Sequence, residues 1–91
     1  ADAALALGLV NWVVEPAELE ARAAEILGRL AAGPTFAYGR TKALFNETWE
    51  HPMAEQLDAE LASFGRCIPT HDFAEGTAAF VQKRKPSFTG R

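Results

Sequence analysis

The residues best suited to chemistry are a ring and a cation near the end of the chain, Phe80 and Lys83. Residues three positions apart lie on one face of a helix, so we expect the two side chains to be neighbours. An aromatic face stacks on a flat heterocycle and an ammonium group binds phosphate, which suits a ligand that carries a nucleotide. The competing interpretation, which the pair alone favours, places Phe80 in a core and Lys83 in solvent at a helix end.

Basic residues gather in the same region, because four of the nine in the chain are Lys83, Arg84, Lys85 and Arg91. A cluster of this kind attracts a phosphate-bearing ligand. Nucleic acid is a poor alternative, since the formal net charge is −3 and no exposed aromatic residues alternate with the cations. We expect no nucleic-acid partner.

The remaining polar residues do not assemble a catalytic or metal site. His51 and His71 stand at expected helix boundaries without a cluster of ligands, so we predict two surface histidines and no metal site. Cys67 has Arg66 beside it but no base, which favours a neutral or buried thiol. The sequence shows no nucleophile with a base, no oxyanion turn and no pair of convergent acids, so we expect the 91 residues to be inactive alone.

Proline and glycine divide the chain into the helices that must position these residues. The expected helices are an Ala/Leu-rich one that ends at Gly8, one over residues 16–32, one from Pro34 to about Glu50, one from about Pro52 to Arg66, and one from Asp72 that stops before Pro86. Residues 9–14 are predicted to be extended, and a lone strand forms no sheet. The predicted fold is therefore all-α, with four to five short helices and one short extended segment.

The last of these helices carries signals for both of its ends. Asp72 is the predicted N-cap, with Glu75 three residues later as a variant of the capping box. Lys83, Arg84 and Lys85 are predicted in the last turn, where cations complement the helix dipole. The aromatic residue and the cation are thus expected on the C-terminal turn of a helix that ends at a proline.

Length and composition describe one small unit, residues 1–91. Apolar residues make up 48%, enough for a modest core, and no apolar run approaches the ~20 residues that span a bilayer. A single cysteine fits a reducing compartment, so we expect a cytoplasmic protein without a membrane partner. The chain opens at Ala1 without a Met and already within a helix, from which we expect it to be a piece of something longer.

Several segments, in order, resemble the C-terminal portion of the crotonase (enoyl-CoA hydratase/isomerase) superfamily. The stretch from Asp72 to Phe88 is similar to the family's closing pattern, D-x-x-E-G followed by A-F-x-x-K-R-x-P-x-F. The upstream matches are residues 3–14, which follow A-x-x-L-G-L-V-N-x-V-V, then Glu18, Leu19, residues 30–34, Lys42, Leu57, Glu60 and Phe64. Each piece is common, whereas the ordered set covers essentially the whole chain and is specific.

This resemblance implies the C-terminal helical region of the crotonase fold, without the ββα spiral core. The family acts on acyl-CoA thioesters, and its oxyanion hole and acid/base glutamates belong to that core. The resemblance implies no covalently bound cofactor; Phe80 and Lys83 would lie near the adenine and phosphates of the substrate's coenzyme A moiety, with Phe64 as a further aromatic. The implied partners are the acyl-CoA substrate, the protein's own N-terminal spiral core and the other subunits of a homo-trimer or a dimer of trimers.

The rival interpretation is a free-standing helical protein-interaction module with no enzymatic role. It predicts a self-sufficient core that buries five residues together, Leu19, Ile26, Leu30, Leu57 and Leu61. A segment of a larger enzyme instead leaves apolar surface uncovered. The opening helix, Trp12 and Phe88 are the expected parts of that surface.

Overall fold

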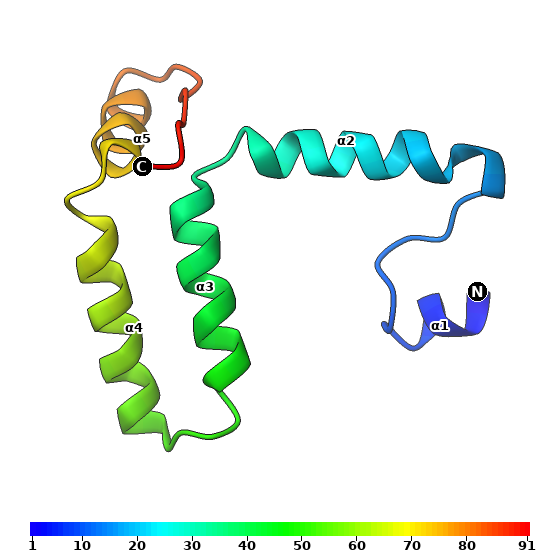
Figure 1. Ribbon diagram of the computed structural model, residues 1–91, viewed down its shortest axis with the longest axis horizontal. Coiled ribbons are helices and arrows are strands. Elements are labelled where there is room, and N and C mark those ends of the chain that lie inside the picture. The colour runs from blue at the N-terminus through cyan, green and yellow to red at the C-terminus, as the bar shows by residue number, and fades with distance from the viewer.

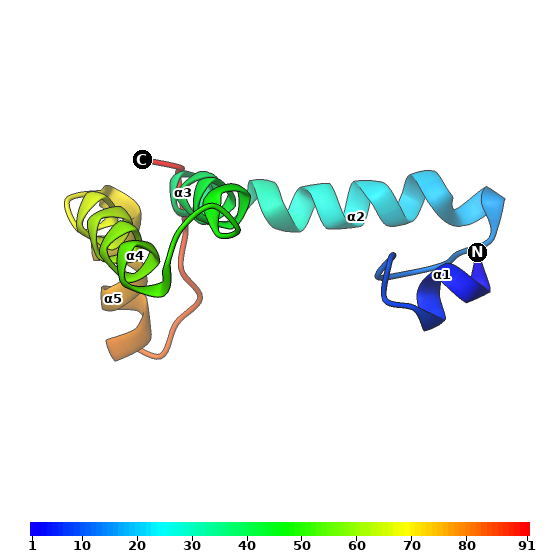
Figure 2. The same cartoon turned by 90° about the horizontal axis from the view of Figure 1, so that it is seen from below.

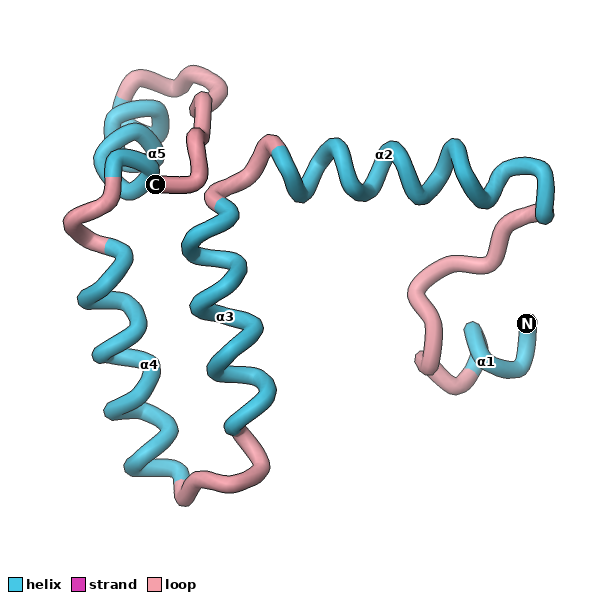
Figure 3. Tube along the Cα trace, viewed as in Figure 1, coloured by secondary structure: helices cyan, strands magenta, loops and turns pink.

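Helices are the only regular secondary structure in the computed structural model, which describes residues 1–91 (Figure 1, Figure 3). The elements in chain order are α1 (Asp2–Ala6), the short 3-10 helix η1 (Pro16–Glu18), α2 (Leu19–Ala31), α3 (Thr35–Glu47), α4 (Met53–Cys67) and α5 (His71–Val81). The all-α prediction is confirmed. Residues 9–14 form a non-helical connection that pairs with no other segment, so no strand is present.

The helices are arranged openly. α3 and α4 form an antiparallel hairpin, and α5 with the C-terminal tail lies at the open end of that hairpin (Figure 1). α2 leaves the hairpin as a separate arm, and α1 lies near the far end of this arm (Figure 2). The Cα radius of gyration is 16.9 Å, whereas a compact domain of this length has about 12 Å. The arm and the hairpin therefore do not close around a common core.

The chain buries very little of its own surface. Five residues are buried, namely Gly33, Gln56, Ser63, Asp72 and Ala79. The leucines that a free-standing module would bury are exposed, from 50% at Leu30 to 70% at Leu61, and Ile26 is half-buried. The interpretation as a self-sufficient module is therefore wrong. Uncovered apolar surface is confirmed on the opening helix and at Trp12, which is 50% exposed.

The turn between α3 and α4 begins earlier than predicted. α3 ends at Glu47 rather than near Glu50. The Thr48 hydroxyl donates to the carbonyl of Leu44 at 2.8 Å, a bond that competes with continued helical pairing. Pro52 also disfavours helical backbone at the residue before it, so α4 begins only after this proline.

The start of α5 differs from the prediction. Thr70 is the N-cap, in extended conformation, and its hydroxyl accepts the N–H of Phe73 at 3.1 Å. Asp72 and Glu75 lie inside the helix, so the predicted capping box is wrong. Threonine and aspartate are both good N-caps. Thr70 is the one used because its hydroxyl also donates to the carbonyl of Cys67, which fixes the turn after α4. The two carboxylates are thereby free to bind other groups.

The end of α5 also differs from the prediction. The helix ends at Val81, so Lys83, Arg84 and Lys85 lie beyond its last turn and their predicted role at the helix dipole is wrong. Residues 82–91 instead turn back along α5 (Figure 1), and the carbonyl of Arg91 accepts a hydrogen bond near the start of that helix. None of the helices combines the length and the apolar character needed to cross a membrane.

Candidate functional site

The C-terminal turn of α5 holds Phe80 and Lys83 in a defined backbone geometry. The Lys83 N–H donates to the Phe80 carbonyl at 3.2 Å and the Arg84 N–H to the Ala79 carbonyl at 3.0 Å, which are the paired bonds of a left-handed helix cap. Lys83 has a φ of 54°, the one positive φ outside the glycines. Left-handed backbone costs a residue with a side chain ~1–2 kcal/mol, so the surrounding contacts must hold Lys83 in place.

Glu75 makes the contacts that close this turn. Its carboxylate oxygens accept hydrogen bonds from Nη1 and Nη2 of Arg84 at 2.6 and 2.8 Å. Oε1 also accepts a hydrogen bond from the N–H of Ser87 at 2.8 Å. We call these three residues the Glu75 clamp. The bonds from the Arg84 side chain and the Ser87 N–H outweigh the effect of burial and lower the pKa of Glu75 to about 2. The carboxylate is therefore ionised, and the clamp is closed, at neutral pH.

Asp72 binds the end of the tail in a similar way. Burial opposes its charge, but hydrogen bonds from the N–H groups of Thr89 (2.7 Å) and Gly90 (2.8 Å), with His71 and the Thr89 hydroxyl, hold the pKa of Asp72 below its ordinary value. Gly90 has a φ of 79°, and a Cβ built on it would lie 2.5 Å from Oγ1 of Thr35. Glycine is thus required where the tail passes the start of α3.

Phe88 fastens the middle of the tail to α5. A Cβ at Gly76 would lie 3.4 Å from the Phe88 ring, so the ring rests against the bare backbone of the helix. The ring is half-buried and lines a small cavity of about 230 Å³ together with Pro34 and Phe36 at the start of α3. The prediction that Phe88 belongs to the uncovered apolar surface is therefore wrong.

The turn joins the backbones of Phe80 and Lys83 and leaves both side chains exposed. The Phe80 ring is 85% exposed, so the interpretation of Phe80 as a core residue does not hold within this chain. The Lys83 side chain is exposed and makes no hydrogen bond or ion pair, whereas its neighbour Arg84 is bound by Glu75. Lys83 lies outside the helix, so the two residues are related by the left-handed turn and not by a shared helical face.

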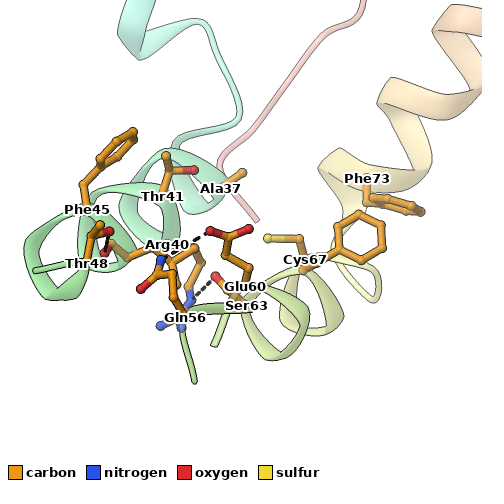
Figure 4. Close-up of a pocket in the computed structure, with 12 residues that line it drawn as sticks. Ala37, Arg40, Thr41, Phe45, Thr48, Gln56, Glu60, Ser63, Cys67 and Phe73 are labelled. Carbon is orange, nitrogen blue, oxygen red and sulfur yellow. Dashed lines mark hydrogen bonds between the residues drawn. The ribbon is translucent and has the colours of Figure 1, made fainter. Parts of the chain in front are cut away.

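Phe64 lies apart from this pair. It belongs to α4, is 55% exposed, and meets Phe73 edge-on with ring centroids 5.9 Å apart and an interplanar angle of 76°. Both rings line a cavity of about 500 Å³ between α3 and α4. Figure 4 labels Phe73 among the residues around this cavity. Neither Phe80 nor Lys83 lines that cavity. The three residues singled out by the sequence thus form one pair and one separate aromatic.

The cavity between α3 and α4 also holds polar groups, of which the sequence pattern included only Glu60. Arg40 Nε donates to Ser63 Oγ at 3.2 Å, and Gln56 Nε2 donates to Glu60 Oε1 at 3.3 Å (Figure 4). The side-chain oxygen of Gln56 is buried without a partner. Arg40 and Ser63 are 23 positions apart on two helices, and no local sequence pattern reports such a contact.

The histidines and the cysteine form no further centre. His51 lies 4.0 Å from a carboxylate oxygen of Glu47 and 3.4 Å from one of Glu55. His71 is exposed beside Asp72, and Cys67 is half-buried. No three His, Cys, Asp or Glu side chains come close enough together to hold a metal ion. The best candidate for ligand binding in this chain is therefore the turn at the end of α5.

Known proteins match the chain along its whole length. The sequence profile of the family described as enoyl-CoA hydratase/isomerase matches residues 1–91. Crotonyl-CoA hydratase of Syntrophomonas wolfei is 37% identical over 91 residues, which are 100% of this chain and 35% of that protein. Trans-2-decenoyl-(acyl-carrier-protein) isomerase of Streptococcus mutans is 36% identical over 94 residues, again 100% of this chain and 35% of the relative.

The fold is shared as well as the sequence. The crystal structure of an enoyl-CoA hydratase/isomerase from Mycobacterium paratuberculosis matches with a TM-score of 0.91 at 32% identity, over 100% of this chain and 36% of that one. An enoyl-CoA hydratase from Bacillus anthracis matches with a TM-score of 0.88 at 31% identity, over 100% and 35%. The chain spans about a third of the length of these relatives.

Proposed function

The chain belongs to the enoyl-CoA hydratase/isomerase family, and on that premise we propose that it is the C-terminal helical segment of an enzyme that acts on acyl-CoA thioesters. The observation that carries the proposal is the match of the family profile to residues 1–91. The segment supplies contacts between subunits and part of the wall of the coenzyme A site. The oxyanion hole and the acid/base residues are contributed by the spiral core and not by this segment.

Phe80 and Lys83 form the proposed wall of the coenzyme site. An exposed ring stacks on adenine, and an ammonium group without a partner in the chain binds a phosphate of the same nucleotide. The bonds of the left-handed turn fix the Lys83 backbone relative to that of Phe80. The backbone that carries the pair is therefore ordered before the ligand arrives, which reduces the backbone entropy lost on binding.

Phe64 contributes a second, separate aromatic to the proposed site. Its ring is half exposed over the cavity between α3 and α4. Phe64 and the Phe80–Lys83 pair line no common cavity in one chain. We therefore propose that Phe64 lines a different part of the coenzyme A site.

The contacts with other parts of the enzyme are proposed to use the uncovered apolar side chains. Apart from Phe80, those exposed to between 70% and 93% are Leu7, Leu9, Phe45, Trp49, Met53, Leu61 and Val81. Large apolar side chains left exposed in this way mark sites of association. The proposed partners are the protein's own N-terminal spiral core and the other subunits of a homo-trimer or a dimer of trimers.

A pair of substrates tests the coenzyme contact in the complete enzyme. One is a short enoyl-CoA, and the other is the matching enoyl-pantetheine thioester, which has the same reacting group but lacks the nucleotide. Lys83→Met removes one charge-assisted phosphate contact and is expected to raise KM for the CoA thioester about tenfold. KM for the pantetheine thioester is expected to stay unchanged.

Lys85→Met is the matched control, because it removes a neighbouring cation that the proposal leaves out of the site. Equal effects of the two variants, or an equal effect of Lys83→Met on both substrates, would contradict the proposed contact. A second candidate substrate is an acyl-carrier-protein thioester, on which the Streptococcus mutans relative is named to act. Faster turnover of that thioester than of the CoA thioester would favour this candidate.

A further inference from the structure

The residues on both sides of Lys83 are tethered, although Lys83 itself is free. Arg84 Nε donates to Oε1 of Gln82 at 2.7 Å, and the rest of its guanidinium group binds both carboxylate oxygens of Glu75. The Ser87 N–H binds the same carboxylate at 2.8 Å. The strained left-handed residue is thus framed by a network whose central group is Glu75.

The same hydrogen bonds distinguish Arg84, whose side chain is paired, from Lys83, whose side chain is unpaired. Arg84 forms a two-point ion pair with Glu75, so its charge is already balanced. The Lys83 side chain is left without a partner one position earlier. Without Glu75, a flexible arginine would compete for the phosphate next to the lysine, and the turn would lose the bonds that oppose its strain.

We propose that Glu75 is a positioning residue for the coenzyme contact: by binding Arg84 and the Ser87 N–H it holds Lys83 in its left-handed turn beside Phe80. This inference rests on the proposed function, in which Lys83 binds a coenzyme phosphate. Glu75 touches neither substrate nor reacting atoms in this arrangement. Through Lys83, it affects only how tightly the nucleotide end of the ligand is bound.

The test compares Glu75→Gln, Lys83→Met and the double variant in the complete enzyme, with the same CoA and pantetheine thioesters. Glu75→Gln keeps the size of the side chain and removes the two-point ion pair. It is expected to raise KM for the CoA thioester about threefold and to leave kcat and KM for the pantetheine thioester unchanged. The double variant is expected to equal Lys83→Met alone, because Glu75 acts through Lys83.

Asp72→Asn is the matched control. It weakens the hold of the same helix on the same tail at Thr89 and Gly90, 2.7 and 2.8 Å from the carboxylate, but leaves the clamp intact. Its expected effect is a lower midpoint of thermal unfolding without a change in KM. If Glu75→Gln does not yield folded enzyme, Arg84→Gln breaks the same ion pair from its other side and is expected to raise KM for the CoA thioester without changing KM for the pantetheine thioester.

Three results would overturn the inference: full additivity in the double variant, a parallel rise of KM for the pantetheine thioester, or an Arg84→Gln enzyme that folds and keeps its KM for the CoA thioester. No effect of Glu75→Gln while Lys83→Met remains effective would overturn this inference alone. No effect of Lys83→Met would overturn the proposed coenzyme contact itself, so the two failures are distinguishable.

Discussion

Two helix ends in this chain have the same hydrogen bonds and different residues. At the end of α1, the N–H groups of Gly8 and Leu9 donate to the carbonyls of Leu5 and Ala4 at 3.0 and 2.9 Å. Lys83 completes the same pair of bonds at the end of α5. Gly8 has a φ of 70° and open space around it, whereas Lys83 has a φ of 54° and carries a long side chain.

The difference indicates at which of the two helix ends the side chain of the left-handed residue has a role. Glycine adopts left-handed backbone as readily as right-handed, so Gly8 simply ends its helix. Lysine in the same position introduces strain, and the turn fixes the backbone from which its cationic side chain extends. The Glu75 clamp opposes that strain at α5, and α1 has no counterpart. We therefore interpret the end of α1 as a helix stop and the end of α5 as a positioned functional group.

Acid is expected to have the largest effect on the difference between the two helix ends, because protonation of Glu75 breaks the ion pair of the clamp at α5. The pKa of Glu75 is about 2 in the folded chain, against an ordinary value of 4.5. A carboxyl group with a lowered pKa stabilises the fold fully above its ordinary pKa, and that stabilisation is lost as the pH falls through the folded value. We expect the bonds between Arg84 and Glu75 to persist at about pH 4 and to break below about pH 2.

An NMR titration of the Glu75 carboxyl carbon measures this loss directly. The ordinary glutamate pKa of 4.5 provides the reference. A midpoint for Glu75 at that ordinary value would show that the clamp does not hold its charge.

Gly90→Ala is expected to lower the free energy of unfolding by about 2 kcal/mol, from left-handed strain and from contact with Thr35. Gly8→Ala is the matched control, since it adds the same Cβ at a φ of 70° with nothing within 4 Å. Its expected loss is about 1 kcal/mol. Chemical denaturation measures both variants, and equal losses would show that the tail is not seated against α3.

Lys83→Gly is expected to raise the free energy of unfolding by about 1 kcal/mol, because glycine relieves the strain of the turn. The reciprocal change, Gly8→Lys, is expected to lower it by about 1 kcal/mol. Thermal unfolding of each variant measures the change. A loss of stability in Lys83→Gly would mean that the lysine side chain supports the fold, and that the interpretation of its role is wrong.

The smallest effect is expected on the other arm of the molecule, at Arg22. Its guanidinium carbon lies 4.9 Å from the centre of the Trp12 ring, and the side chain also pairs with Glu25. Arg22→Met is expected to lower the free energy of unfolding by about 0.5 kcal/mol. Glu25→Gln removes the ion pair and keeps the cation over the ring, so a shift of tryptophan fluorescence in Arg22→Met alone would identify the ring contact.

The sequence predicts the helices well and their ends less well. Gly8, Gly33 and Pro52 stop or restart the backbone for local reasons, so the number of helices follows from the sequence. The cap of α5 does not, because Thr70 and Asp72 are both suitable and the turn after α4 decides between them. Lys83 is also misplaced, since a left-handed lysine has no distinct local signal and depends on tail contacts with Glu75.

The candidate site could be predicted only in part. The Phe80–Lys83 pair is recognisable because three residues of spacing bring the two together in a helix or in a tight turn. Arg40 and Ser63 meet across two helices, so their contact could not be predicted from local spacing. The apolar stripe around Leu61 indicates a face that needs cover, but a stripe carries no information about which surface covers it.

The open arm of α2 has a thermodynamic consequence. With five buried residues out of 91, this chain exposes little additional apolar area when it unfolds by itself, so its own heat-capacity change is small. In the proposed enzyme, most of that area leaves water only on association with the spiral core and with other subunits. Ordering of this segment and assembly of the enzyme are then a single equilibrium, with a midpoint that rises with protein concentration.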